Sequence, residues 1–449
     1  MILKICPPKN NNKSSKITKI IIGILISIIL LLILFLLIII FAANNIKKER
    51  DELKEKLDIA NSKQKNDTKE DTKEEDKDNS HWEIYGKKIS NISYADNNGK
   101  IFNSFKKTGE NYKEKLGEIN NGLDYEKNDR NIYDLYIPYY ALERKLKYNR
   151  ILLNIHGGCW VGGSKEVYDK ECKEYLKSGF ICAAMSYTLL IGYNNSNIFR
   201  ILDEIISVVK NIKNYLKNEG FDENKLELVL RGGSAGAHLS LYYAYTIKNS
   251  TIPVKFVINA MGPVTLDFNH WLKVKNIDEP LENINPYSIQ KAYDEGKLEI
   301  IKRDINNISP IFLAIIMNLF VGGKLGDDLG DIIKDKEKLE INTESENYKK
   351  MLEKAEFAFP YLFVDKDSPP TICFYGGKDI DVGIAQYSLL KKKFDENNNN
   401  NIKLIYSKYS SHEYIDYETE DGKNKQRDCY LEFLRFSDMY FTKDKTEDL

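Results

Sequence analysis

The sequence predicts an α/β fold in which a mostly parallel sheet is flanked by helices. Short apolar runs, typical of buried strands, recur at 150–155, 225–230, 254–259, 370–375 and 402–406. The first two runs lead directly into glycine-rich turns, and the second turn is followed by an apolar segment typical of a helix, 237–244. Strands that alternate with helices in this way favour parallel pairing.

The first 80 residues precede this pattern and differ from it in composition. Residues 1–19 are short and basic, 20–43 carry no charge, and 44–80 are rich in Lys, Glu, Asp and Asn. A bilayer core of about 30 Å needs about 20 apolar helical residues, and Phe41-Ala42-Ala43 is a poor signal-peptidase site. We therefore expect a single transmembrane helix at 20–43 and a disordered, solvated tether at 44–80.

Basic residues on the two sides of the expected span predict its orientation. Five lysines and no acid precede the span, whereas 47–52 mixes basic and acidic residues. The positive-inside rule then places the N-terminus in the cytosol and the folded domain, 81–449, outside the cell or in a lumen. Five of the six cysteines lie in that domain. An odd number of cysteines fits an oxidising compartment poorly, which counts against a folded domain outside the cell or in a lumen.

The strand pattern at 150–155 runs into His156-Gly157-Gly158-Cys159-Trp160. Glycines here let the main chain approach a substrate oxygen, so that backbone N–H groups form an oxyanion hole. The alternative is a plain turn that closes a βα unit, with His156 hydrogen-bonded inside its own loop.

Gly232-Gly233-Ser234-Ala235-Gly236 fits the pattern G-x-S-x-G between a strand and a helix. In that setting a serine is held on a strained elbow with its hydroxyl exposed, and the small flanking residues avoid a collision of Cβ atoms. The pattern also recurs by chance in Gly/Ser-rich loops. With the glycine turn upstream, it makes Ser234 the candidate nucleophile and the N–H of Ala235 a further oxyanion donor.

Between the strand at 254–259 and the next one lies a long insertion, 267–363. It contains Trp271, the apolar run 311–317 and charged runs typical of helices. We expect a helical cap over the face that carries Ser234; the alternative is a peripheral decoration.

A serine nucleophile needs a base that an acid positions. The chain offers His81, His156, His238, His270 and His412. The order serine, acid, histidine excludes the first two, His238 lies one turn along the nucleophile helix, and His270 precedes every plausible acid strand. His412 remains as the candidate base.

The acid must follow a strand and precede His412. Asp379 is the first carboxylate after the strand 370–375 and its glycine turn, and Asp381, two residues later, is the alternative. We expect Asp381 to cap or begin the next helix. Asp365 and Asp367 precede the strand and would lie at its wrong end.

From about Tyr133 to Phe436 the chain resembles the α/β-hydrolase superfamily, in particular its HGG-type esterases. That branch includes hormone-sensitive-lipase-like and feruloyl-esterase-like enzymes, kynurenine formamidases and isoprenylcysteine methylesterases. The segments that carry the resemblance are 133–138, 156–165 and 232–238. The resemblance implies Ser234 as nucleophile, Asp379 as acid and His412 as base, with Gly157, Gly158 and Ala235 lining the oxyanion hole.

Two positions depart from the resemblance. Cys159 replaces the third glycine of many lipase-like members, which keeps the backbone donor but narrows the site. Thr188 follows Tyr187 where the family often has an arginine, so that a local salt bridge is in doubt.

A net charge of −1 and the lack of a basic patch argue against a nucleic-acid partner. No C-x-x-C pair is present, so we expect neither a metal nor a cofactor, and Cys182 and Cys373 are expected to be buried thiols. The leading hypothesis is a membrane-anchored serine hydrolase of small carboxylic esters. Alternatives are an amide or peptide hydrolase with the same triad and a non-catalytic, hydrolase-like binding protein.

Overall fold

The computed structural model describes residues 79–96, 98–101, 125–144, 149–271, 273–274, 300–301, 310–324, 327–335, 340–377, 379, 381–407, 410–412 and 432–441. The chain divides into two compact units, Met1–Ser80 and His81–Leu449. Within the described residues, no helix combines the length and apolar character needed to span a bilayer. The basic segment 1–19, the predicted span 20–43 and nearly all of the predicted tether 44–80 lie outside the described residues.

An eight-stranded sheet forms the centre of the second unit. From edge to edge it contains β1 (Gly86–Ser93), β4 (Ile132–Pro138), β6 (Ile181–Met185), β5 (Asn149–Ile155), β7 (Leu226–Gly233), β8 (Val254–Ala260), β13 (Thr371–Gly376) and β14 (Ile402–Ser407). β4 runs opposite to the other seven strands, which are parallel to one another. The predicted mostly parallel sheet is thus confirmed, and strands covered on both faces explain the continuous apolar runs.

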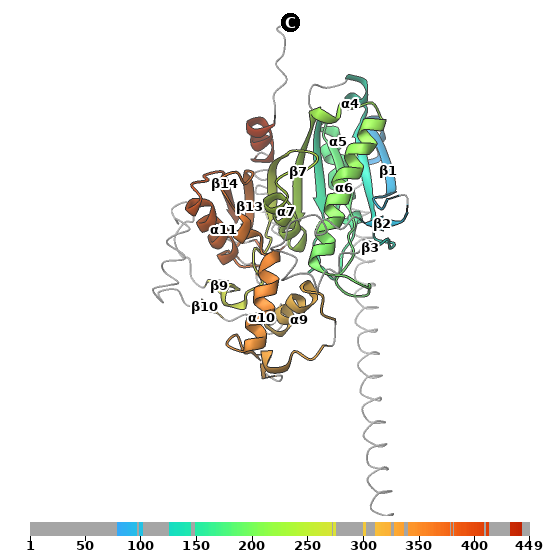
Figure 1. Cartoon of the computed structure of the whole chain (residues 1–449). Coiled ribbons are helices and arrows are strands. Elements are labelled where there is room, and N and C mark those ends of the chain that lie inside the picture. Colours follow the sequence, from blue (N-terminus) through green and yellow to red (C-terminus); the bar gives the residue numbers. More distant parts are fainter. Residues whose placement is uncertain are drawn as a thin grey trace, which may run out of the picture. The chain divides into compact units, whose positions relative to one another are not determined.

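Helices cover both faces of the sheet (Figure 1). One face carries α6 (Ile198–Asn218), α7 (Ala235–Thr246) and α11 (Ala385–Glu396), and the ring of Tyr245 in α7 lies 5.9 Å from that of Phe394 in α11. The other carries α5 (Asp169–Lys177) and a helix at 432–440. There Phe433 contacts both Tyr175 of α5 and Phe256 of β8. The predicted flanking helices are therefore confirmed.

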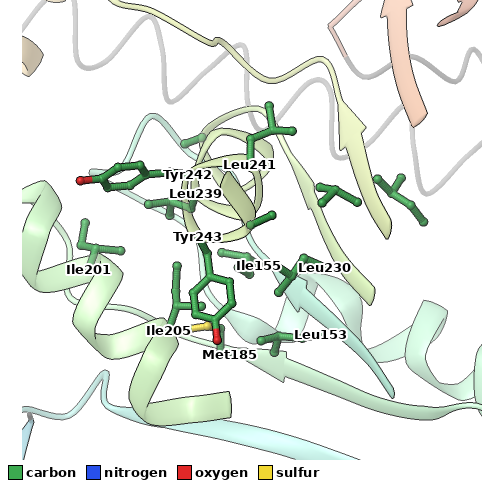
Figure 2. Close-up of a cluster of buried hydrophobic side chains, with 14 of the residues drawn as sticks. Leu153, Ile155, Met185, Ile201, Ile205, Leu230, Leu239, Leu241, Tyr242 and Tyr243 are labelled. Carbon is green, nitrogen blue, oxygen red and sulfur yellow. The ribbon is translucent and has the colours of Figure 1, made fainter. Parts of the chain in front are cut away.

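The core between α6, α7 and the central strands fixes the start of α7 (Figure 2). Ile201 and Ile205 of α6 and Leu239 and Tyr243 of α7 are buried beside strand side chains that include Leu153, Ile155, Met185 and Leu230. This packing holds the N-terminus of α7 over β5 and β7. Cys182 and Cys373 are buried in β6 and β13, as predicted.

The described residues of the stretch 267–363, between β8 and β13, include the helices α9 (Pro310–Phe320) and α10 (Glu346–Ala355). Its short elements are η5 (Phe268–His270), β9 (Lys273–Val274), β10 (Ile300–Ile301), η7 (Gly330–Ile332), β11 (Ile333–Asp335), β12 (Glu340–Ile341), η8 (Glu356–Ala358) and η9 (Pro360–Phe363). The Ser345 hydroxyl caps α10 by accepting the Tyr348 N–H at 3.0 Å. The Tyr348 hydroxyl donates to Asp267 at 3.0 Å, which ties α10 to the beginning of the insertion.

The remaining described elements are η1 (Asn79–Ile84), β2 (Lys100–Ile101), β3 (Tyr125–Glu126), α4 (Tyr139–Arg144), η3 (Lys165–Tyr168) and η4 (Glu223–Lys225). We call the edge where the parallel strands end the carboxyl edge, and the opposite edge the amino edge. β5 lies between β6 and β7, so the chain leaves β5 toward one side and returns to β7 on the other. In open α/β sheets such a reversal opens a ligand crevice at the carboxyl edge.

Candidate active site

Ser234 lies on a strained turn between β7 and α7. Its backbone has φ 53° and ψ −121°, a left-handed conformation that a non-glycine residue rarely adopts. A Cβ atom on Gly236 would lie 1.9 Å from the carbonyl oxygen of Ile155, and one on Gly232 would lie 2.2 Å from the carbonyl carbon of Gly236. The elbow can therefore form only because both positions are glycine.

The glycine turn after β5 lies directly against this elbow. A Cβ atom on Gly157 would lie 3.4 Å from Ser234 Cβ and 2.8 Å from the carbonyl oxygen of Gly233. Among the described residues, none accepts a hydrogen bond from the N–H of Gly157 or Gly158. Ala235 is the first residue of α7, where a backbone N–H has no partner within the helix. Gly157 and Ala235, two of the predicted oxyanion donors, thus flank the serine at two adjacent strand ends, and Gly158 follows Gly157 in the same turn.

His156 supports the turn and is not available as a base. Its Nδ1 lies 2.8 Å from the carbonyl oxygen of Gly157, and its Nε2 lies 3.1 Å from the Arg130 guanidinium. Nδ1 must therefore carry the proton and Nε2 must accept from Arg130. Burial lowers the pKa of His156 to about 4, so the ring is neutral at pH 7. It stacks on Tyr187 with 4.1 Å between ring centroids.

The position after Tyr187 has no arginine, but an ion pair close to it is made by an arginine from another part of the chain. Glu204 of α6 accepts the N–H of Thr188 at 2.7 Å and the Nε–H of Arg200 at 2.9 Å. Arg200 and Glu204 are both buried. Helix α6 therefore supplies the guanidinium that residue 188 lacks. Local sequence reasoning missed Arg200 and Arg130, because each acts on a strand end distant in the sequence.

Asp379 and His412 meet at the carboxyl edge of β13 and β14. His412 Nδ1 lies 2.9 Å from Asp379 Oδ2, and Asp379 is 2% exposed. A Cβ atom on Gly376 would lie 2.2 Å from the carbonyl oxygen of Ser410, so the loops that follow the two strands are in close contact. The structure thus joins the predicted acid to the predicted base.

Asp381 does not have the role that the sequence suggested. Helix α11 begins at Ala385 with Ile384 before it, and it has no acid in its first turn. The prediction that Asp381 caps or begins this helix is therefore wrong. Instead Asp379 Oδ1 accepts the N–H groups of Asp381 and Val382 at 2.7 and 2.8 Å, so the turn is closed by the Asp379 carboxylate itself.

Ser234 and His412 lie on the same edge of the sheet, with β8 and β13 between the strands β7 and β14 that precede them. The Ser234 N–H donates to the carbonyl oxygen of Ala260 at 2.8 Å, and the Met261 N–H donates to that of Phe374 at 2.8 Å. No hydrogen bond joins the Ser234 hydroxyl to His412 among the described residues. Such bonds in unliganded enzymes are often long and tighten only with substrate. The role of His412 as base to Ser234 stays a prediction.

His238 contacts the insertion, as expected of a packing residue. It is buried, its Nε2 lies 2.8 Å from the carbonyl oxygen of Ala358, and burial lowers its pKa to about 3. Trp160, at the end of the glycine turn, contacts both His238 and Phe320 of α9, with ring centroids 5.1 and 4.9 Å apart. The insertion therefore borders the crevice through α9.

Asp379, Asp381 and His412 are also close enough for a metal ion, since one ligand atom of each lies within 4.8 Å of the others. Both oxygens of Asp379 already have hydrogen-bond partners. The hydrogen bonds of the acid–base pair explain why these three side chains lie close together, and we assign no metal to them.

Part of the chain is similar to a known protein family. Residues 133–312 match the family model BD-FAE. The sequence matches no curated protein. Similar solved structures include a truncated carbohydrate esterase from gut microbiota, with 15% identity, coverage of 78% of this chain and 96% of that one, and a TM-score of 0.46.

Two further similar structures are also esterases. Esterase B from Lactobacillus rhamnosis has 14% identity over 79% of this chain and 87% of its own, with a TM-score of 0.45. A butyrate-bound esterase from Thermogutta terrifontis has 15% identity over 70% and 92%, with a TM-score of 0.42. At such identities the likeness carries no substrate over to this chain.

Proposed function

We propose that this chain, whose residues 133–312 match BD-FAE, an α/β-hydrolase family model, hydrolyses carboxylic esters through an acyl-enzyme on Ser234. The observation that carries the proposal is that residues after four strands, β5, β7, β13 and β14, lie at the same edge of the sheet. Gly157 after β5 lies against Ser234 after β7, and Asp379 after β13 is bonded to His412 on the same edge. Nucleophile, oxyanion donors, acid and base are the groups that acyl transfer requires.

The hydrogen bond between Asp379 and His412 assigns a role to each ring nitrogen. His412 Nδ1–H donates to Asp379 Oδ2, which leaves Nε2 as the basic nitrogen. Ser234 Oγ attacks the ester carbonyl carbon while its proton passes to Nε2. The carbon–oxygen bond to the alcohol then breaks, and the alcohol leaves with that proton.

Water completes the cycle by the same route. His412 removes a proton from water, the hydroxide attacks the acyl carbon, and Ser234 recovers the proton as the acid leaves. The N–H groups of Gly157, Gly158 and Ala235 would hold the oxyanion in both halves of the reaction. One such donor is worth about 2.7–4 kcal/mol of transition-state stabilisation.

The enzyme would act at a membrane surface. The uncharged stretch 20–43 would anchor the enzyme, and the lysines before it would keep the N-terminus in the cytosol and the catalytic domain on the other side.

A fluorophosphonate probe tests the proposal, because it labels an activated serine whatever the natural substrate is. We expect labelling of Ser234 in the full-length protein and none in Ser234→Ala. Ser207→Ala is the matched control. Its hydroxyl bonds only to the Asp203 carbonyl within α6, so labelling should persist.

The outcome also separates the alternative functions. A folded protein without labelling would contradict the hydrolase and leave a non-catalytic binding protein. Labelling together with faster cleavage of anilides than of matched p-nitrophenyl esters would make it an amidase.

A further inference from the structure

Four large hydrophobic side chains are exposed together where the described chain begins. Ile84, Tyr85, Tyr139 and Tyr140 are 65%, 41%, 42% and 45% exposed. The N–H of Tyr139 donates to the carbonyl oxygen of Tyr85 at 2.9 Å, so the two segments adjoin. We call these four residues the amino-edge patch. Grouped apolar exposure of this kind marks an interaction surface more often than single exposed residues do.

The register of the sheet places the patch opposite the active site. Gly86, which follows Tyr85, pairs with Pro138, which precedes Tyr139. β4 is antiparallel to β6, so Pro138 lies near the first residues of β6 and therefore at the amino edge. Figure 1 shows α4 at the end of the domain opposite α9 and α10. Ser234 and His412 lie at the carboxyl edge.

The two lysines that follow the patch in β1 are already paired with acids. Lys88 lies 2.6 Å from Asp169 and 3.2 Å from Asp134, and Lys87 lies 2.5 Å from Glu219. The surface thus offers aromatic rings without a surplus of cations. Tyrosine has an apolar ring and a polar hydroxyl, a combination enriched at the interface of membrane and water. The chemistry fits a bilayer interface better than an anionic polymer.

The position of the patch in the chain also favours a bilayer. The predicted span ends at residue 43, and a tether of about 37 residues leads to His81. A flexible chain of that length has a root-mean-square extent of about 33 Å. It would keep the domain at a local concentration on the order of millimolar relative to the membrane. Even a weak contact would then be occupied.

We propose that the amino-edge patch rests on the phospholipid bilayer that holds the predicted span, so that the carboxyl edge faces the aqueous phase. The expectation that this placement gives for the substrate rests on the proposed esterase function. With Ser234 on the far side of the sheet from the bilayer, the enzyme takes esters dissolved in water and not the acyl chains of the membrane beneath it.

Photo-crosslinking in the full-length protein tests the contact. Tyr140 is replaced by p-benzoylphenylalanine, which inserts into neighbouring C–H bonds on irradiation, and the protein is reconstituted in phosphatidylcholine nanodiscs. The matched control carries the same residue at Val167, which is 61% exposed in η3. Val167 lies near the carboxyl edge, because the hydroxyl of the next residue, Tyr168, bonds to Ile155 and Gly233 at the ends of β5 and β7. We expect at least tenfold more phospholipid adduct at position 140 than at 167, at low and at high salt.

Several results would overturn the contact. Equal adducts at both positions, none at 140, or an adduct that high salt abolishes would each exclude a bilayer contact made by aromatic side chains. A crosslink from 140 to a second copy would make the patch a dimer interface.

Fluorophosphonate labelling of Ser234 in the same samples separates the two proposals. Lipid adducts without labelling of Ser234 would support the bilayer contact and contradict the esterase function. Labelling without lipid adducts would support the esterase function and contradict the bilayer contact. Labelled enzyme that releases fatty acid from the nanodisc faster than it cleaves a dissolved p-nitrophenyl ester would contradict the predicted substrate.

Discussion

Asp379 holds His412 with one carboxylate oxygen and its own loop with the other. Oδ2 lies 2.9 Å from His412 Nδ1, while Oδ1 accepts two backbone N–H groups, those of Asp381 and Val382. The carboxylate is therefore fixed in rotation before any substrate arrives. Such prior orientation is what an acid contributes to a catalytic histidine.

This arrangement predicts a large difference between Asp379→Asn and Asp381→Asn. An asparagine at 379 can still accept the two backbone N–H groups through Oδ1, so the fold should survive. Its amide NH₂ would face His412 and impose the wrong tautomer, which should lower kcat by about 10⁴-fold. Asp381→Asn should change kcat less than about tenfold. Steady-state hydrolysis of p-nitrophenyl acetate by both variants checks the ranking, and the reverse order would reassign the acid.

The elbow predicts that Gly236 tolerates no side chain. A Cβ atom there would lie 1.9 Å from the Ile155 carbonyl oxygen, so Gly236→Ala should cost more than about 3 kcal/mol of unfolding free energy or prevent folding. Gly162→Ala is the control, since its Cβ would meet only the Gly158 oxygen at 3.8 Å. Urea denaturation of both proteins measures the difference. A stable, active Gly236→Ala protein would contradict the elbow geometry.

The buried histidines predict a loss of stability in acid. Burial lowers the pKa of His156 to about 4 and that of His238 to about 3. Below the unfolded value of about 6.5 the unfolded chain binds protons that the folded chain refuses. The unfolding free energy is therefore highest above pH 6.5 and falls as pH decreases toward 4.

The variant His238→Gln separates the part of the pH dependence of stability that His238 causes from the part that the carboxylates cause. Glutamine can still donate to the Ala358 carbonyl but does not titrate. Urea midpoints between pH 7 and pH 4 should fall less steeply in this variant. An unchanged slope would mean that His238 is already protonated, or already exposed, in the folded state.

Loss of one partner of the buried Arg200–Glu204 pair should destabilise the protein strongly. Arg200→Met leaves a buried carboxylate without its cation, which should cost about 3–5 kcal/mol. Lys217→Met provides the comparison, because its partner Glu223 is reached at 2.8 Å with Lys217 58% exposed, and such pairs contribute about 0–1 kcal/mol. Chemical denaturation of the two variants measures both values. Equal losses would show that Glu204 finds other compensation.

The predicted span should remain in the mature protein, because 20–43 is long and Phe41-Ala42-Ala43 is a poor cleavage site. Terminal sequencing and extraction from membranes by alkaline carbonate check this. A mature N-terminus near Asn44 would instead identify a signal peptide.

The sequence predicted the parts of the site that depend on local backbone. Gly232, Gly236 and Gly157 are required by contacts within a few ångströms of Ser234, so their presence in a short motif predicts the turn itself. The strands were found for a similar reason, because β5, β7 and β13 are buried along almost their whole length.

What the sequence did not predict depends on distant partners. Arg130 reaches His156, and Arg200 pairs with the glutamate that binds the N–H of Thr188, yet neither position has a local pattern that indicates this. The role of Asp381 was mistaken because a loop acid before a helix usually caps it. Here the backbone of the loop is already satisfied by Asp379, and α11 begins later.

The strand order has a consequence for biosynthesis. β13 and β14 occupy the last two places at one margin of the sheet and come after its other six strands in the chain. A nascent chain can thus form the elbow and the glycine turn while the residues that would activate Ser234 are still in the ribosome. The serine would stay inert during translation until His412 has emerged and β14 has joined the sheet. Completion of the sheet would then switch the enzyme on.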